Sequence, residues 1–176
     1  MSRETTPAAL LVLAGLSLVS AGALSAPAPQ SQTRSFRLEA PCKQVFALFT
    51  ADGERAWAPG WEPEILSGSV ERGSVFRTQN GDRETVWIVT AYAPTQGRVS
   101  YARIAQGSNM GLVDVRCSGL NPHASEISVT YTLTGITPDG KAFVGQFFAD
   151  EAYTAFIQEW REAITAHLDA GATPAR

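Results

Sequence analysis

Several residue types and motifs that would reveal a chemistry are scarce or missing in this sequence. There are only two histidines and two cysteines, none paired at the spacing of metal ligands, so we expect no metal site. No G-x-S-x-G or G-x-G-x-x-G occurs, which argues against an α/β-hydrolase nucleophile and a dinucleotide-binding fold. Residues 135–142 spell G-x-x-x-x-G-K, but Ala142 stands where a phosphate-binding loop needs Ser or Thr. We therefore expect no cofactor and interpret residues 138–140, Pro-Asp-Gly, as a turn.

Charged residues are sparse at the N-terminus and balanced elsewhere. The formal net charge is -3, and no run of Lys and Arg occurs, so neither nucleic acid nor an anionic membrane surface is an expected partner. No charged side chain lies between Thr5 and Thr33, and Leu10 to Val19 is strongly apolar. This pattern predicts a signal peptide over residues 1–26 and export, to a periplasm or out of the cell. The alternative is an uncleaved segment that anchors the chain to the membrane, which would then be its only membrane contact.

The rest of the 176 residues suits one domain. We expect a flexible lead-in over 27–33, a single domain over 34–170 and a tail over 171–176. Cys42 and Cys117 fall near one end of the expected sheet, but on elements that are not neighbours. Although export would permit a disulfide, we expect the two thiols to remain unpaired.

Alternation of apolar and polar residues predicts an antiparallel sheet with one buried face. The first strand is expected over Arg34–Ala40, and the clearest strand is Ser125–Ile136. Asn80-Gly81 is typical of a hairpin turn. Further strands are predicted at Val75–Thr78, Glu84–Tyr92, Arg98–Ile104 and Met110–Cys117.

Helical spacing predicts the cover of this sheet. Pro41 and the apolar residues after it indicate short helices behind the first strand. From about Gln146 to Ala170 apolar residues recur at helical spacing, which predicts one long helix. The expected fold is α+β: a curved antiparallel sheet of about seven strands wrapped around a long C-terminal helix, with two short helices after the first strand. Because such a sheet cannot close fully on one helix, we expect a pocket between them.

Several segments follow one another in an order that resembles a known superfamily: "FRLEAPCKQVFALFT", "GERAWAPGWEPEIL", "ETVWIVTAYAPTQGRVSYARI", "GLVDVRC" and "SVTYTLTGI". The chain resembles the START/SRPBCC superfamily, the helix-grip fold, within its polyketide cyclase/dehydrase and lipid-transport-like branch. The resemblance covers roughly Ser35 to Leu168 and implies a cavity for a mostly apolar small molecule. Cys42 departs from the small residue or proline that is common at its position, and an export signal is also unusual.

Two of the four tryptophans, Trp57 and Trp61, flank the pair Pro59 and Gly60. Proline and glycine suit the two central positions of a type II turn, which would fix both indoles in place. In a helix-grip protein this segment lies near the cavity mouth, so the resemblance implies that the tryptophans contact ligand. The alternative is that they pack the loop onto the core.

Strand parity places the polar candidates. Arg103 points inward if Val99 does, and it then anchors a carboxylate, phosphate or carbonyl of a ligand, or it pairs at the sheet rim with Glu84 or Glu64. In the next strand we favour the register in which Trp87 points inward and Glu84 outward. In the other register Glu84 enters the cavity as a candidate acid.

These arguments leave three hypotheses for function. The first is binding of a hydrophobic or amphipathic small molecule. The second is a cyclase- or dehydrase-type enzyme, a lyase or isomerase, with Glu84, Arg103 and Tyr101 as weak catalytic candidates. The third is a protein-interaction domain with an exposed Trp57–Trp61 loop. The candidate ligand-binding residues are Trp57, Trp61, Phe76, Trp87, Tyr101, Arg103, Val113, Tyr131, Phe156 and Trp160.

Overall fold

The computed structural model describes residues 28–172, so the predicted signal peptide and most of the predicted tail lie outside the described residues. The elements are β1 (Gln30–Leu38), α1 (Cys42–Val45), the 3₁₀ helices η1 (Phe46–Phe49) and η2 (Gly53–Ala56), β2 (Glu64–Ser67), β3 (Val75–Asn80), β4 (Arg83–Ala93), the 3₁₀ helix η3 (Pro94–Gln96), β5 (Arg98–Ala105), β6 (Asn109–Asn121), β7 (Ala124–Gly135), α2 (Pro138–Phe147) and α3 (Asp150–Ala172). None of these helices is long and apolar enough to cross a membrane.

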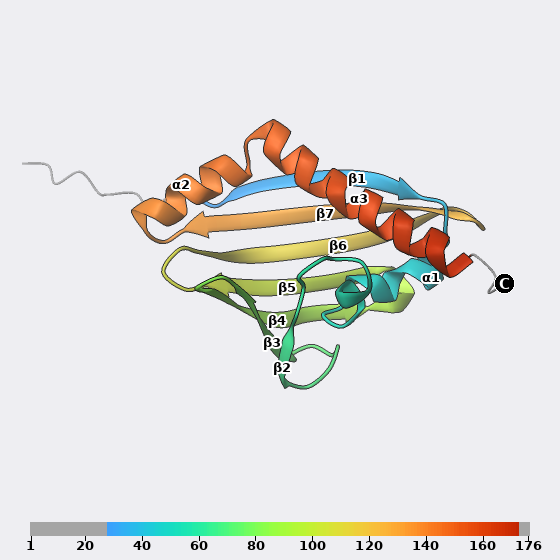
Figure 1. Cartoon of the computed structure of the whole chain (residues 1–176), viewed down its shortest axis with the longest axis horizontal. Coiled ribbons are helices and arrows are strands. Elements are labelled where there is room, and N and C mark those ends of the chain that lie inside the picture. Colours follow the sequence, from blue (N-terminus) through green and yellow to red (C-terminus); the bar gives the residue numbers. More distant parts are fainter. Residues whose placement is uncertain (1–27, 173–176) are drawn as a thin grey trace, which may run out of the picture.

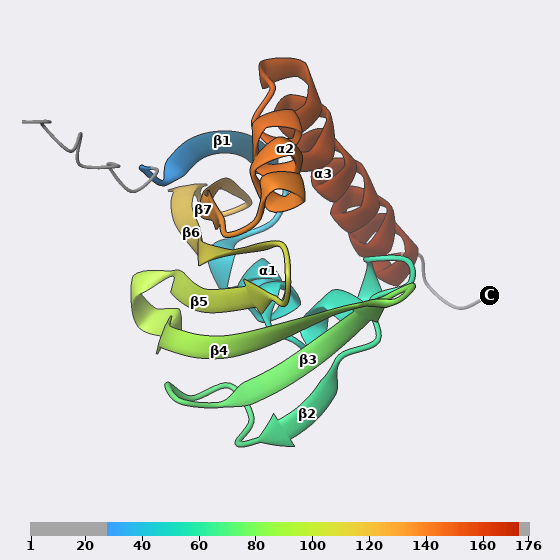
Figure 2. The same cartoon turned by 90° about the vertical axis from the view of Figure 1, so that its left-hand side faces the viewer.

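The seven strands form one antiparallel sheet in the order β1-β7-β6-β5-β4-β3-β2. Figure 1 shows α3 lying across the β1 side of the sheet, and Figure 2 shows the other strands curling away around the interior. Helix α3 packs along β1 and α2 along β7. The predicted helix-grip architecture is therefore confirmed, although β1 begins at Gln30 and takes in part of the expected lead-in.

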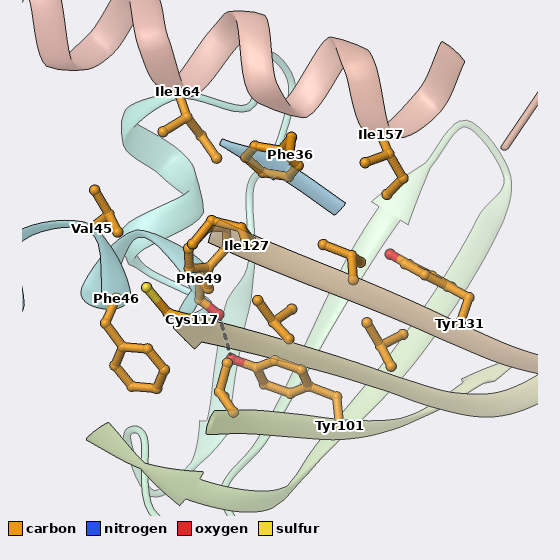
Figure 3. Close-up of a cluster of buried hydrophobic side chains, with 14 of the residues drawn as sticks. Phe36, Val45, Phe46, Phe49, Tyr101, Cys117, Ile127, Tyr131, Ile157 and Ile164 are labelled. Carbon is orange, nitrogen blue, oxygen red and sulfur yellow. Dashed lines mark hydrogen bonds between the residues drawn. The ribbon is translucent and has the colours of Figure 1, made fainter. Parts of the chain in front are cut away.

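Strand alternation decides which side chains face the interior. In β5, Val99 and Tyr101 are buried, and Arg103 lies on the same face as expected. In β4, Trp87 is buried whereas Glu84 faces outward, which confirms the favoured register. The inward residues of β7 are buried as predicted: Ile127, Val129, Tyr131 and Leu133. Figure 3 shows how the aliphatic side chains of α3 reach toward this layer.

The long C-terminal helix predicted from about Gln146 to Ala170 is confirmed as α3, which begins at Asp150, but the helix α2 before it was not predicted. Thr137 caps α2 by accepting a hydrogen bond from the Gly140 amide, and Pro138 suits the first helical turn. The predicted Pro-Asp-Gly turn is therefore the start of a helix. The chain bends at Phe148, whose carbonyl accepts a 2.7 Å hydrogen bond from the Gln32 amide group. The bend lets each helix follow a different strand of the curved sheet.

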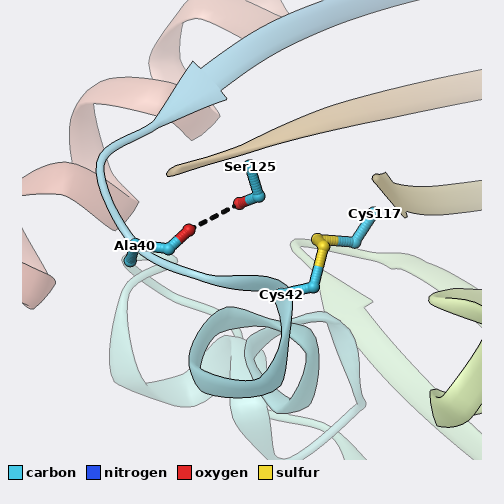
Figure 4. Close-up of a disulfide and its surroundings, with 4 residues drawn as sticks. All are labelled: Ala40, Cys42, Cys117 and Ser125. Atoms are coloured by element: carbon cyan, nitrogen blue, oxygen red, sulfur yellow. Dashed lines mark hydrogen bonds between the residues drawn. A yellow bond between two sulfur atoms is a disulfide. The ribbon is translucent and has the colours of Figure 1, made fainter. Parts of the chain in front are cut away.

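Cys42 and Cys117 form a disulfide, so the expectation of unpaired thiols was wrong. Their Cα atoms are 5.8 Å apart, within the range that a disulfide spans. The prediction considered only whether the two cysteines lie on neighbouring strands of the sheet. Instead, α1, which carries Cys42, lies over the inner face of the sheet at the end of β6, where Cys117 points inward (Figure 4). A hydrogen bond from the Ser125 hydroxyl to the Ala40 carbonyl holds the chain just before α1.

Removing this disulfide should destabilise the fold. The two half-cystines are 75 residues apart in sequence, so the loop-closure argument gives a loss of about 4.5 kcal/mol of unfolding free energy in the Cys42→Ser, Cys117→Ser variant. Urea unfolding of the variant and of the parent, each with and without reductant, measures the loss. Reductant should weaken only the parent, and equal sensitivity in both proteins would contradict the bridge.

Candidate functional site

The loop from η2 to β2 places both tryptophans against the interior. Gly60 has φ of 75°, as the second central residue of a type II turn requires, and the Trp61 amide donates to the Ala58 carbonyl at 3.2 Å. The Trp57 indole N–H donates to the Leu48 carbonyl at 2.7 Å, and that of Trp61 donates to the Ala51 carbonyl at 2.8 Å. The loop is thus tied to the short helices, while the indole faces remain available.

Neither tryptophan is strongly exposed, although the protein-interaction hypothesis requires both to be. Trp57 is 7% exposed and Trp61 is half-buried. An anchor for a protein partner needs large exposed apolar side chains. The geometry of the loop therefore favours the two hypotheses that use an internal site.

A cavity of about 240 Å³ lies between the sheet, the tryptophan loop and the C-terminal helices. All ten candidate ligand-binding residues named from the sequence line it: Trp57, Trp61, Phe76, Trp87, Tyr101, Arg103, Val113, Tyr131, Phe156 and Trp160. Glu84 does not line it. Sequence reasoning missed the other five lining residues, namely Glu54, Ala58, Val115, Phe143 and Phe147. The two phenylalanines were missed because α2 was not predicted.

Aromatic contacts make the walls of this cavity well packed. Phe76 and Trp87 stack with their rings parallel and the ring centroids 5.8 Å apart, and Trp61 meets both rings edge-on. On the opposite side Trp57 meets Trp160 of α3 edge-on at 5.2 Å. Such contacts hold aromatic side chains in defined positions. The cavity therefore has a fixed, largely aromatic wall.

Of the described residues that line the cavity, Arg103 is the one cation, and it does not pair with Glu64 or Glu84, the partners considered at the sheet rim. Its guanidinium lies over the Trp87 ring at 5.3 Å, and its buried Nε has no hydrogen-bond partner among residues 28–172. The two carboxylates proposed as rim partners, Glu64 and Glu84, instead pair with Arg77 on the outer face, at 2.8 and 3.2 Å. Burial lowers the pKa of Arg103, but a guanidinium remains charged at neutral pH.

Glu54 of η2 contributes a carboxyl group to the cavity wall. Its side chain is 9% exposed, and within the described part of the chain it makes no hydrogen bond or ion pair. Burial raises its pKa from 4.5 to about 8, so the group is mainly protonated at neutral pH. The sequence "GERA" carries no signal for this, because a lone glutamate in a short helix is usually exposed.

The two tyrosines in the wall differ in what their hydroxyls can do. Tyr101 donates a 2.7 Å hydrogen bond to the Phe49 carbonyl, which ties it into the core (Figure 3). The Tyr131 hydroxyl makes no hydrogen bond within residues 28–172. Burial raises its pKa above the ordinary range, whereas the charge of Arg103 acts in the opposite direction. Tyr131, Arg103 and Glu54 are thus the polar groups available to a molecule in the cavity.

Comparison with known proteins gives structural neighbours only. No protein-family model and no curated protein sequence matches the chain. Norcoclaurine synthase from Thalictrum flavum, in complex with dopamine and hydroxybenzaldehyde, has a TM-score of 0.63 at 12% identity, over 96% of this chain and 100% of that one. An uncharacterised protein from Rhizobium leguminosarum has a TM-score of 0.56 at 13% identity, over 81% of this chain and 97% of that one. DynU16 from the dynemicin biosynthetic locus has a TM-score of 0.56 at 16% identity, over 80% of this chain and 48% of that one.

At these identities the similarity establishes the helix-grip fold. That fold agrees with the START/SRPBCC resemblance of the sequence. It does not assign a reaction, because one fold carries many functions.

The buried carboxyl of Glu54 should make stability depend on pH. Its folded-state pKa of about 8 lies above 4.5, so the folded chain holds this proton more tightly than the unfolded chain does. Relative to Glu54→Gln, the wild type should lose up to about 1.4 kcal/mol of unfolding free energy per pH unit between about pH 5 and pH 8, then level off.

Urea unfolding of both proteins across this pH range measures the effect. Glu84→Gln is the matched control, because it removes a glutamate on the outer face of the same protein. A difference between wild type and Glu54→Gln that stays constant with pH would show that the carboxyl is ionised or exposed in the folded state.

Proposed function

We propose that this protein binds a small, mainly aromatic molecule, hydrophobic or amphipathic, in the cavity between the sheet and the C-terminal helices. The observation that carries the proposal is the aromatic wall around about 240 Å³, interrupted by only a few polar groups. A cavity of about 150 Å³ holds benzene, so this one has room for a molecule of one or two rings. Apolar cavities with a few convergent polar groups are the usual sites for such ligands.

The structural neighbours support this proposal. Norcoclaurine synthase, which has the same fold, was solved in complex with dopamine and hydroxybenzaldehyde, two small aromatic compounds. DynU16 comes from a biosynthetic locus. Membership of the polyketide cyclase/dehydrase and lipid-transport-like branch of START/SRPBCC is part of the proposal and rests on the sequence resemblance.

Export of the protein is also part of the proposal. The apolar, charge-free segment before Thr33 supports it. The disulfide between Cys42 and Cys117 supports it independently, because disulfides persist mainly in oxidising compartments. A cell fractionation with intact-mass measurement would test both export and cleavage.

Filling the cavity should weaken binding. All four tryptophans of the chain line the cavity, so their fluorescence reports on its contents. Val113→Phe places a ring in the space that a ligand would occupy and should weaken binding of naphthalene derivatives by about tenfold or more, a loss of about 1.4 kcal/mol or more. Leu112→Phe, at the adjacent exposed position, is the matched control.

Far-ultraviolet circular dichroism of both variants checks that they fold. The proposal fails if wild-type fluorescence does not respond to any compound in a panel of one- and two-ring aromatics. It also fails if Val113→Phe and Leu112→Phe bind those compounds equally well.

A second candidate function is an enzyme of cyclase or dehydrase type, and the position of Glu54 favours it. A carboxyl group with a pKa of about 8, inside an apolar cavity that also holds Tyr131 and Arg103, suits proton transfer near neutral pH. Glu54 would take a proton from a carbon next to a carbonyl, and Arg103 and Tyr131 would stabilise the enolate oxygen. Glu84 has no part in this, because it lies on the outer face.

Hydrogen exchange at the α-carbon of a bound ketone tests the enzyme hypothesis. In heavy water, nuclear magnetic resonance should show the protein accelerating deuterium uptake by 2-tetralone, with a rate that rises to a plateau above about pH 8. Glu54→Gln should remove the acceleration and leave binding intact, while Glu84→Gln should retain both. Acceleration that survives in Glu54→Gln would exclude this residue as the base.

A further inference from the structure

Arg103 lies at a boundary between the aromatic cavity and the surface. It lines the cavity on one side and a polar depression on the other, which Asn80, Arg83, Gln106 and Asp139 also line. Arg103 lies near the C-terminal end of β5, and Figure 2 shows this end of the strand turning into β6. A group entering from that depression therefore meets the guanidinium before it meets the aromatic wall.

No described residue neutralises this charge. Glu64 and Glu84 are held by Arg77 on the outer face, and Asp139 lines the depression without forming an ion pair to Arg103. Glu54 is mainly protonated at neutral pH. A largely buried charge is costly unless it finds a partner. The cavity thus carries one uncompensated positive charge.

We propose that the ligands of this cavity are aromatic compounds with a single carboxylate, which pairs with Arg103 while the ring lies against the aromatic wall. This inference rests on the proposed function and specifies its ligand class. A planar guanidinium matches a carboxylate through two parallel hydrogen bonds, and the unpaired Nε supplies one donor. The Tyr131 hydroxyl, which lines the same cavity and interacts electrostatically with Arg103, provides a further donor.

One negative charge fits this site better than two. A phosphate carries about -1.5 to -2 at neutral pH and needs several donors. Among residues 28–172, Arg103 is the only cationic side chain in the cavity wall, whereas Arg83 lines only the outer depression. The rest of the cavity wall is mainly aromatic. A dianion would therefore retain charge without a partner in a nonpolar environment.

The same geometry makes binding depend on pH. The other titratable groups in the wall, Tyr101 and Tyr131, stay neutral because burial raises their pKa values. The side chains that α2 and α3 contribute to the wall are all aromatic, so these helices add no titratable group. Ionisation of Glu54 above about pH 8 would bring the net charge of the cavity to zero. Attraction for an anionic ligand should then fall.

The test compares 2-naphthoate with 2-naphthamide, which has the same shape without the charge. Binding to the full chain is followed by tryptophan fluorescence at about pH 6.5 and pH 9. At the lower pH naphthoate should bind about 10- to 100-fold more tightly than the amide, as a charged hydrogen-bonded pair allows. The preference should shrink at the higher pH in wild type and persist there in Glu54→Gln.

Arg103→Met should abolish the preference, whereas Arg116→Met, on the exposed side of β6, should keep it. Since Arg103→Met removes a largely buried, unpaired charge, its unfolding temperature should not fall. Arg103→Lys keeps the charge and should retain a weaker preference, which separates charge from shape.

The outcomes distinguish the two proposals. If neither naphthalene compound binds, the proposed function itself is wrong for molecules of this size and kind. If the amide binds as tightly as naphthoate, or if Arg103→Met retains the preference, the cavity binds aromatic compounds but the assignment of a carboxylate site is overturned. If the preference for naphthoate still falls at pH 9 in Glu54→Gln, the role assigned to Glu54 is overturned.

Discussion

The structure depends on one geometric constraint: a sheet that curls around a single long helix cannot be filled by that helix alone. Where α3 packs on β1 and its Tyr153 hydroxyl donates to the Val129 carbonyl of β7, aliphatic side chains such as Ile127, Ile157 and Ile164 are almost fully buried. Farther along the curl, β3, β4 and β5 lie beyond the reach of α3. There Phe76 and Trp87 extend into the interior, because only large side chains span the remaining distance.

The tryptophan loop closes the space that this curvature leaves, and a chain of contacts fixes its position. The disulfide from Cys117 holds the start of α1 on the sheet. Leu48 of η1 and Ala51, in the turn between η1 and η2, present the carbonyls that accept the hydrogen bonds of the two indoles. The same two indoles therefore do both: their N–H groups hold the loop on the short helices, and their ring faces line the cavity.

Strand parity was the most informative part of the sequence. It predicted the inward positions of Trp87, Tyr101 and Arg103, because a strand alternates sides whatever its neighbours are. Helical spacing likewise predicted Phe156 and Trp160. Three features depended on long-range contacts instead: the bend at Phe148, the disulfide and the burial of Glu54. Each arises where α1, η2 or α2 meets the sheet, and local patterns carry no information about such meetings.

Arg103 and Glu54 are costly residues for the positions they occupy. On β6, the strand next to β5, Val113 and Val115 face the same cavity, so apolar side chains are compatible with this wall. A leucine or methionine in place of either polar residue would avoid desolvating a charge or a carboxyl group, and buried ionic groups are often replaced by apolar ones without loss of stability. Retaining an unpaired guanidinium and an unpaired carboxyl in one aromatic cavity therefore opposes folding. Sites where local stability is sacrificed in this way are characteristic of binding and catalysis, so these two residues, more than the aromatic wall around them, support the proposal that the cavity is a functional site.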